Sequence, residues 1–171
     1  MPATPFRLVA DVAHHRLFDV AATGTVAEID NVGHRPHITY HTVGLNGRPF
    51  TAAWAGSGRI ALWGQDGLGT IDTRTWTTHP IAGGVTGAVT TRYGIAAWTA
   101  NPADGLTVYR PDGSPRLHVL AGKAIRSAQA VGPYLYATVK ARYSVDLRTG
   151  KVTGPLHTNA TIIPPTLTLI P

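Results

Sequence analysis

Four histidines recur at nearly constant spacing, and this spacing constrains the fold more than any other feature of the sequence. They are His41, His79, His118 and His157, which lie 38, 39 and 39 residues apart. The segments that begin at the middle two histidines are nearly alike, HPIAGG and HVLAGK. A fixed period of this length is typical of repeat architectures. The chain is therefore expected to contain four copies of one structural unit.

Each repeat contains four short segments that have the character of β-strands. A segment rich in small residues comes first, then a compact apolar run, then an alternating segment, and last the segment that carries the histidine. Alternation with period two is typical of strands. The expected first, second and third strands of the four repeats lie at 7–11, 17–20 and 26–30; 50–54, 60–63 and 68–72; 87–91, 95–98 and 106–110; and 127–131, 135–138 and 143–147.

Polar turns separate these segments, and several contain Asp-Gly or Thr-Gly, which suit hairpin turns. Asp30, Asp72, Asp112 and Asp146 fall in the turn between the third and fourth strands, where an aspartate bonds the turn backbone. The 19 glycines and 13 prolines, together with a single glutamate, agree with short strands and turns rather than helices.

Four-stranded antiparallel units of this length are blades of a β-propeller. We therefore expect an all-β fold in which one propeller domain covers residues 1–171. The expected blades span approximately 6–42, 48–83, 84–123 and 124–158, and 162–171 is an extra C-terminal strand. The small residues of each first strand fit the innermost position, where the blades converge on the axis.

Two stretches resemble particular propeller repeats. The segment YSVDLRTGKV, at 143–152, is similar to the third strand, turn and fourth strand of quinoprotein-type blades, and VYRPDGS, at 108–114, resembles the same place in streptogramin-lyase-type propellers. Both are structural turns. The metal ligands and cofactor of the first family, and the histidine and metal-bound carboxylate of the second, have no matching residues here. No cofactor and no metal site are therefore expected.

Four blades can be completed in two ways, and the sequence leaves both open. They can close into a four-bladed monomer. Alternatively, an open half-ring, which would expose apolar blade faces at both ends, can pair by two-fold symmetry into an eight-bladed homodimer. Self-association is accordingly the first partner expected.

The phased histidines themselves are not expected to bind one metal. Ligands must converge to about 2 Å from a single point, whereas equivalent positions in the outermost strands of successive blades are spread around a ring. A repeated structural role, such as a hydrogen bond to a neighbouring turn, is the expectation.

The function expected from the sequence is a non-catalytic binding or scaffold propeller that presents the mouth of its channel to a protein or a small-molecule ligand. The alternative is a propeller enzyme, a lyase or cyclase of streptogramin-lyase type, so catalysis is left undecided. Polar residues in or near the innermost strands are the candidate ligand-binding residues: Asp11, His14, His15, Trp54, Arg92, Tyr93, Arg126 and Gln129. Trp54 is the exception in size, and packing is favoured for it over ligand stacking.

Charge and composition restrict the partners and the compartment. The net charge of +6 is carried by 12 Arg and three Lys, but the arginines are scattered, so nucleic-acid binding is not expected. No apolar run approaches the roughly 20 residues that span a bilayer, so no membrane association is expected. The first residues lack the pattern of a secretory signal, and the Arg-, Ala- and Gly-rich composition suits a GC-rich genome. A bacterial, cytoplasmic protein is the expectation.

Overall fold

A computed structural model describes residues 6–45 and 50–156 of the chain. Within these residues the chain forms sixteen β-strands and two short 3-10 helices, η1 (Val12–His14) and η2 (Pro102–Asp104). No helix among them is long and apolar enough to cross a bilayer.

The strands form four sheets of four, and the order in each sheet follows the chain. Each sheet is an antiparallel meander in which neighbours in sequence are neighbours in space. The strands of blades 1 and 2 are β1 (Phe6–Asp11), β2 (Arg16–Ala21), β3 (Thr25–Asp30), β4 (His37–Thr42), β5 (Phe50–Gly56), β6 (Arg59–Gly64), β7 (Gly67–Asp72) and β8 (Thr77–Ala82). Those of blades 3 and 4 are β9 (Val85–Thr91), β10 (Gly94–Thr99), β11 (Leu106–Tyr109), β12 (Pro115–Val119), β13 (Ser127–Val131), β14 (Tyr134–Thr138), β15 (Arg142–Asp146) and β16 (Val152–Leu156).

This arrangement confirms the all-β fold and the four repeated units predicted from the sequence. Each observed first, second and third strand covers most or all of the expected segment and differs from it by at most a few terminal residues. The expected strand at 162–171 lies outside the described residues, as does His157.

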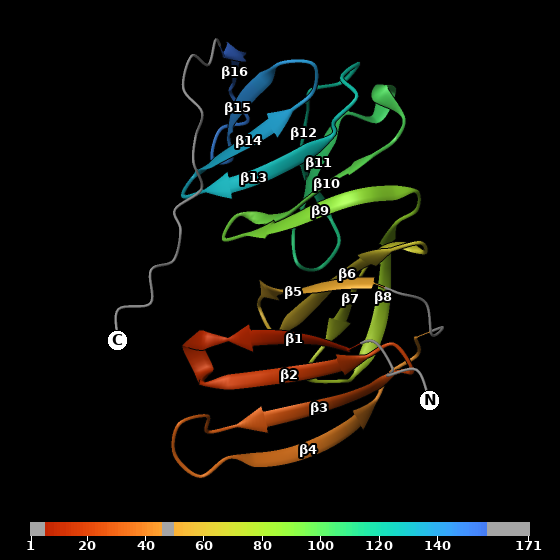
Figure 1. The fold of residues 1–171 in the computed structure, drawn as a ribbon, viewed down its shortest axis with the longest axis vertical. Helices are drawn as coiled ribbons and strands as arrows, with labels where there is room; N and C mark the ends of the chain where they lie inside the picture. The colour runs from red at the N-terminus through yellow and green to blue at the C-terminus, as the bar shows by residue number, and fades with distance from the viewer. Residues whose placement is uncertain (1–5, 46–49, 157–171) are drawn as a thin grey trace.

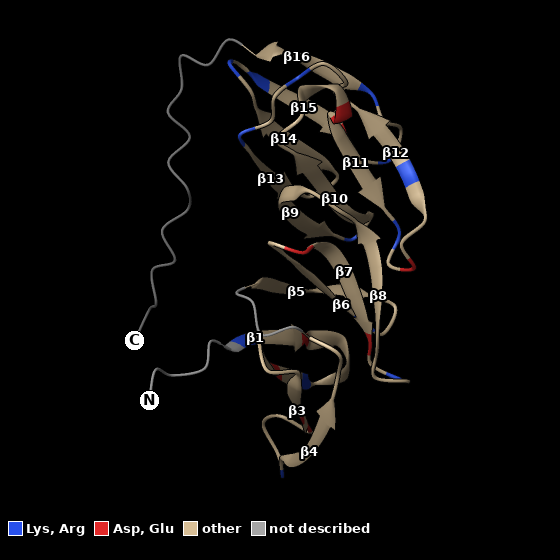
Figure 2. Ribbon diagram, turned by 90° about the vertical axis from the view of Figure 1, so that its right-hand side faces the viewer, with Lys and Arg blue, Asp and Glu red and all other residues tan. Residues whose placement is uncertain are grey.

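The four blades stand side by side in an open row. Figure 1 shows blade 1 (red and orange) at one end and blade 4 (blue) at the other, with blades 2 and 3 between them. In the perpendicular view of Figure 2 the first strands β1, β5, β9 and β13 lie on one side, while β8 and β12 lie on the other. The blades therefore fan out from a line formed by their first strands, and that line is the concave, inner side of the row.

Three apolar clusters join consecutive blades. We call the side of a blade that faces the next blade along the chain its forward face, and the opposite side its backward face. Between blades 1 and 2, forward residues such as Phe18 and Val26 pack on backward residues such as Ile60 and Leu62. The equivalent clusters between blades 2 and 3 and between blades 3 and 4 have the same construction. Side chains alternate across a strand, so each inner strand supplies both clusters that flank it.

The phased histidines that the structure describes lie on the fourth strands, as expected, but they do not bond turns. His41, on β4, lies 3.0 Å from Glu28 of β3, and His118, on β12, lies 3.1 Å from the hydroxyl of Thr107 of β11. The imidazole of His79, on β8, lies 3.1 Å from the Thr77 hydroxyl on its own strand. The partners of these three histidines lie on the same or the adjacent strand and not in a turn, so the expectation of a turn contact was wrong for them.

The predicted role of the turn aspartates is confirmed at three of the four positions. The backbone amides of Arg74, Ser114 and Arg148 each donate to the aspartate two residues earlier, Asp72, Asp112 and Asp146, at 2.8–2.9 Å. Asp146 also accepts from the Arg148 guanidinium at 2.8 and 3.0 Å. The hydrogen bonds from the Arg148 side chain, followed by the one from its backbone, lower the pKa of Asp146 from 3.8 to about 2.

Replacing Arg148 with alanine is expected to raise the pKa of Asp146 from about 2 toward 3.8, because the largest cause of the lowering is removed. In the native chain the folded-state pKa lies below the unfolded value. The Asp146–Arg148 contact therefore stabilises the fold above pH 3.8, and this contribution is lost as the pH falls toward 2. Carboxyl carbon chemical shifts followed through an NMR titration measure the change. Asp112, which Ser114 holds, is the internal control, and an Asp146 that still titrates near 2 in the variant contradicts the assignment.

Candidate functional site

A pocket opens between blades 2 and 3, at the end of the molecule where the first turn and the third turn of every blade lie. The pocket has a volume of about 620 Å³, within the usual range of ligand sites. It is lined by Trp54, Ala55, Gly56, Ser57, Thr90, Thr91, Arg92, Tyr93, Gly94, Arg110, Pro111 and Arg116.

A tight turn between β9 and β10 places Arg92 and Tyr93 at the pocket. The Thr91 hydroxyl accepts from the backbone amide of Tyr93 at 3.0 Å and donates to the carbonyl oxygen of Gly94 at 2.9 Å. Gly94 has a φ of 130°, and a Cβ there would collide with the carbonyl oxygen of Tyr109. Only glycine suits this position, because the turn needs a positive φ and close approach of two backbones.

Two arginines lie close to the Tyr93 ring. Nη2 of Arg92 donates to the Tyr93 hydroxyl at 2.7 Å, and its guanidinium lies 4.8 Å from the ring centroid. Arg116, on β12, lies 5.7 Å from the same centroid, and its Nη1 donates to the carbonyl oxygens of Tyr93 and Leu147. Cation–π contacts of this kind fix the direction in which an arginine points. The ring and both guanidinium groups therefore form one ordered wall.

The pocket carries positive charge that its own walls do not neutralise. None of the described lining residues has a carboxylate, and none of the ion pairs among the described residues involves Arg92, Arg110 or Arg116. Arg110 donates to the Ser114 hydroxyl and to the carbonyl oxygen of Pro115. The pKa of Asp112 is lowered mainly by hydrogen bonds from Ser114, and the nearby charge of Arg110 adds to this lowering. Arg92 and Arg116 are thus the cations most available to a ligand.

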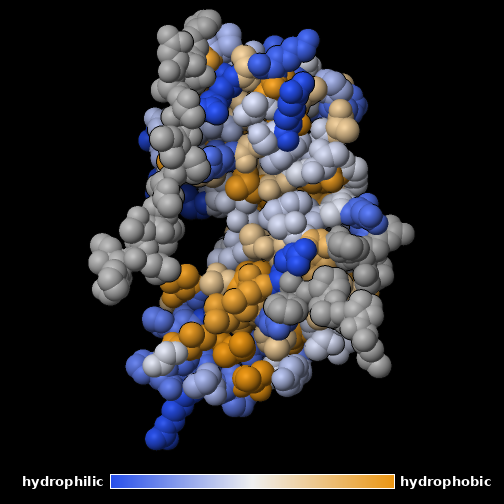
Figure 3. Space-filling view, in the orientation of Figure 1, coloured by the Kyte–Doolittle hydropathy of each residue, from blue (hydrophilic) through white to orange (hydrophobic). Residues whose placement is uncertain are grey.

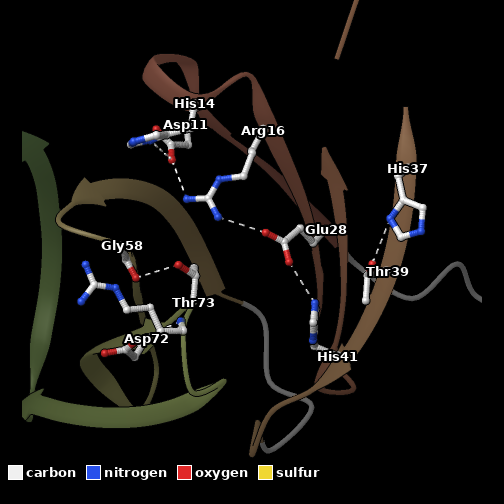
Figure 4. Close-up of polar contacts among 11 residues, drawn as sticks. Asp11, His14, Arg16, Glu28, His37, Thr39, His41, Gly58, Asp72 and Thr73 are labelled. Carbon is white, nitrogen blue, oxygen red and sulfur yellow. Dashed lines mark hydrogen bonds and ion pairs between the residues drawn. The ribbon is translucent and has the colours of Figure 1, made fainter. Parts of the chain in front are cut away.

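A chain of charged side chains crosses blade 1 next to this pocket (Figure 4). Arg16 donates to Asp11 at 2.8 Å and to Glu28 at 3.1 Å, and Glu28 in turn lies 3.0 Å from Nε2 of His41. The side chain of Asp11 is only 1% exposed and also pairs with His14 at 2.8 Å. Because each carboxylate contacts two partners, the network fixes four strands of one blade against each other.

Aromatic rings join this network to blade 2. The His41 ring stacks on Trp76 with centroids 3.7 Å apart, and Phe18 stacks on Trp54 at 5.7 Å. The Arg16 guanidinium lies over both Phe18 and Trp54, at 5.3 and 6.0 Å from the centroids. Trp54 therefore packs against blade 1 while it also lines the pocket.

The predicted site residues fall into separate places. Trp54, Arg92 and Tyr93 come together in the pocket, whereas Asp11 and His14 pair with each other in the blade 1 network. His15 is exposed and has a left-handed backbone, with a φ of 52°.

Two other candidates lie away from the pocket. The backbone amide of Arg126, just before β13, bonds to Thr138 at the opposite end of blade 4. Gln129 is exposed in the middle of β13.

The sequence reasoning missed Arg110 and Arg116 in the pocket, and Arg16 and Glu28 in the network. Arg110 could have been found, because the first and third turns of adjacent blades lie at the same end. Arg116 could not have been found in this way, since its contacts with Tyr93 and Leu147 depend on how two blades pack on each other. Glu28 is the only glutamate of the chain, which was a visible but unused signal.

A second pocket, of about 480 Å³ and mostly apolar, lies at the other end of blade 2. It is lined in part by Leu45, Phe50, Trp63 and His79. Residues 46–49, which follow Leu45 in the sequence, lie outside the described residues.

Comparison with known proteins identifies the class of fold. The sequence matches no protein-family model and no curated protein. Solved structures do match. The dihydro-heme d1 dehydrogenase NirN, in complex with DHE, superposes with a TM-score of 0.61 at 14% identity over 88% of this chain. The computationally designed protein Ika4 has a TM-score of 0.54 at 11% identity over 90%. PorZ, a surface component of the type-IX secretion system of Porphyromonas gingivalis, has a TM-score of 0.52 at 8% identity over 84%.

These likenesses and the four meander sheets define a β-propeller repeat protein. The chain spans 37% of the NirN chain, 91% of the Ika4 chain and 20% of the PorZ chain. At such identities the likeness concerns the fold alone.

Proposed function

We propose that this chain is a non-catalytic binding propeller that takes a carboxylate or phosphate group, carried by a protein or a small molecule, into the pocket between blades 2 and 3. The observation that carries the proposal is the set of three arginines around a pocket whose described lining has no carboxylate. Arginine presents a planar fork of donors that matches both anions.

The aromatic walls suggest what accompanies the anion. Trp54 and Tyr93 line the same pocket as Arg92 and Arg116. An aromatic or otherwise flat apolar group can pack on these rings while its acidic group reaches the guanidinium groups. The chain's net charge of +6 favours the approach of an anion from solution.

Phenyl phosphate and benzoate are suitable probes, with neutral benzamide as the uncharged comparison. We expect both anions, and not benzamide, to bind in isothermal titration calorimetry. Arg92→Ala should weaken anion binding about tenfold or more, because a charge-assisted hydrogen bond is worth about 1.5–3 kcal/mol. Arg92 is exposed, so this change should leave folding intact.

The matched control is Arg74→Ala, which removes an exposed arginine at the same end but outside the pocket. It should bind the anions as the native chain does. Equal binding of benzamide and benzoate would refute the proposal, as would equal weakening by the two arginine variants.

A further inference from the structure

We propose that the backward face of blade 1 and the forward face of blade 4 bind the corresponding faces of a second copy of this chain, so that two half-rings form one eight-bladed ring. This inference is independent of the ligand proposed above. It concerns the two end faces, beside which no further blade of the described chain lies in Figures 1 and 2.

The exposed apolar side chains are concentrated on the two end blades. All eight large hydrophobic residues that are exposed in the described part of the chain belong to blades 1 and 4, and none to blades 2 and 3. They are Leu8, Val12, Val32, Ile38 and Tyr40 of blade 1 and Val131, Tyr134 and Val152 of blade 4. Figure 3 shows hydrophobic residues gathered over the lower blade, which is blade 1. Leu8, Ile38 and Tyr40 lie on the backward face of blade 1, and Val131 and Tyr134 lie on the forward face of blade 4, whereas Val152 lies on the backward face of blade 4. Exposed apolar side chains gathered on one face mark an interaction site.

Strand register shows that the backward face of blade 1 is built like a buried face. One row across its four strands consists of Ala10, Leu17, Ile29 and Ile38. The position of Leu17 is that of Ile60, Ile95 and Leu135 in the other blades, and each of these three is fully buried against the preceding blade. Leu17 therefore occupies a position that a preceding blade covers everywhere else in the chain.

The neighbouring row contains a charge that lacks a partner within the described chain. Asp19, beside Leu17 on β2, has its Oδ1 buried, and that atom makes no hydrogen bond with the described residues. The equivalent residues in the other blades are Leu62, Ala97 and Ala137, which all pack on the blade before. Asp19 as a whole is partly exposed, so a chain that packs on this face would bury the rest of its carboxylate, and a buried carboxylate needs a donor.

The forward face of blade 4 supplies that donor. Arg142, on β15, occupies the position of Val26, Leu68 and Leu106, and its guanidinium has no hydrogen bond or ion pair among the described residues. Val26 shares a cluster with Leu62, Leu68 with Ala97, and Leu106 with Ala137. Blade 4 can pack on blade 1 of a second copy in the same way that consecutive blades pack within the chain. In that arrangement the Arg142 side chain lies beside Asp19 of the second copy.

The second copy is favoured over other occupants because the two end faces complement each other. Blade 1 offers an apolar face with the carboxylate of Asp19. Blade 4 offers two tyrosines, Tyr134 and Tyr136, with the guanidinium of Arg142; the other charges beside Tyr134, Asp146 and Arg148, pair with each other. In a two-fold ring the same contact forms twice, so both end faces of both chains are covered. No further chain can then add to the dimer.

Sedimentation of the full chain tests the proposal. The native protein should have twice the chain mass of 18.1 kDa. Asp19→Arg and Arg142→Asp should each weaken dimerisation by at least about tenfold, since each places like charges together twice per dimer. The double variant restores opposite charges and should regain most of the native affinity.

A mixture of the two single variants gives the sharpest result. In a heterodimer, one interface has the native pair and the other has the reversed pair, so two monomeric variants should form a dimer when mixed. Arg74→Asp makes the same charge change on blade 2 and should leave the dimer unchanged. Circular dichroism of every variant checks that it folds.

Three results would overturn the proposal. A native chain that stays monomeric at high concentration has no second copy on these faces. Dimers that neither single substitution weakens are formed by another surface. A monomer in which truncation after Leu156 newly exposes the face of blade 1 to a hydrophobic dye would show that residues 157–171 cover it instead.

Discussion

Replacing Phe18 with alanine should lower the free energy of unfolding by about 3–5 kcal/mol, the range for a large aromatic lost from a core. Phe18 is fully buried on the forward face of blade 1. Its ring stacks on Trp54 and lies 6.2 Å from Trp76, both in blade 2. The substitution therefore opens a cavity at the centre of the cluster that joins the first two blades. Urea denaturation followed by far-UV circular dichroism measures the loss.

Phe18→Leu is the matched control. Leucine keeps the site apolar and fills most of its volume, so we expect a loss of about 1–1.5 kcal/mol. The difference between the two variants isolates the cavity from the loss of the aromatic stack. A Phe18→Ala chain as stable as the native one would show that blades 1 and 2 are not joined as described.

The second large effect is expected from Arg16→Ala, which should destabilise the chain by about 3 kcal/mol, the lower end of the range for breaking a buried ion pair. Arg16 contacts both Asp11 and Glu28, and the Asp11 side chain is almost fully buried. Without Arg16, only His14 remains paired with that carboxylate. The lower end applies because Arg16 itself keeps some contact with water, with 23% of its side chain exposed.

The loss should depend on pH in a direction that the pKa of Asp11 fixes. Burial alone would raise this pKa, but the hydrogen bonds from Arg16 and His14, together with their charges, outweigh burial and lower it below 3.8. The pair therefore stabilises the fold above pH 3.8, and this contribution is lost as the pH falls through the folded-state value. In Arg16→Ala the pKa rises, so acid unfolding should begin at higher pH than in the native chain.

Arg59→Ala provides the comparison for this experiment. Arg59 occupies the equivalent position in blade 2 and pairs with Asp72 at 3.0 Å, but both side chains are partly exposed. Pairs of this kind contribute about 1 kcal/mol or less. Equal destabilisation by the two substitutions would show that Asp11 is not the source of the larger effect.

The sequence predicted the strands well because each blade repeats the same local pattern. The apolar runs at Ile60, Ile95 and Leu135 are the second strands of three blades, and Gly and Asp mark the turns between them. Because the same pattern occurs in four blades, a strand whose pattern is irregular in one blade can be assigned from the equivalent segments of the others. The expected turn contacts failed for His41 and His118 because strand pairing brings them to residues of the adjacent strand, and for His79 because its partner is on its own strand.

The candidate site could be predicted only in part, since its residues are the ones in which the blades differ. Glu28 occupies the position of Thr70, Val108 and Ser144, so it follows no shared pattern. Asp19 and Arg142 likewise stand where the other blades carry apolar residues. A search for self-similarity finds what the blades share and passes over such residues. Only the packing of one blade on the next shows which of them come together.

The open row also determines where the native structure gives way first. When contacts form mainly between consecutive units, each unit is held in place by the neighbours it touches. Blades 2 and 3 have a neighbour on either side, whereas blades 1 and 4 have one each within the chain. In a single chain, fraying therefore begins at the two ends and proceeds inward, and the cluster between blades 2 and 3 is the last to open.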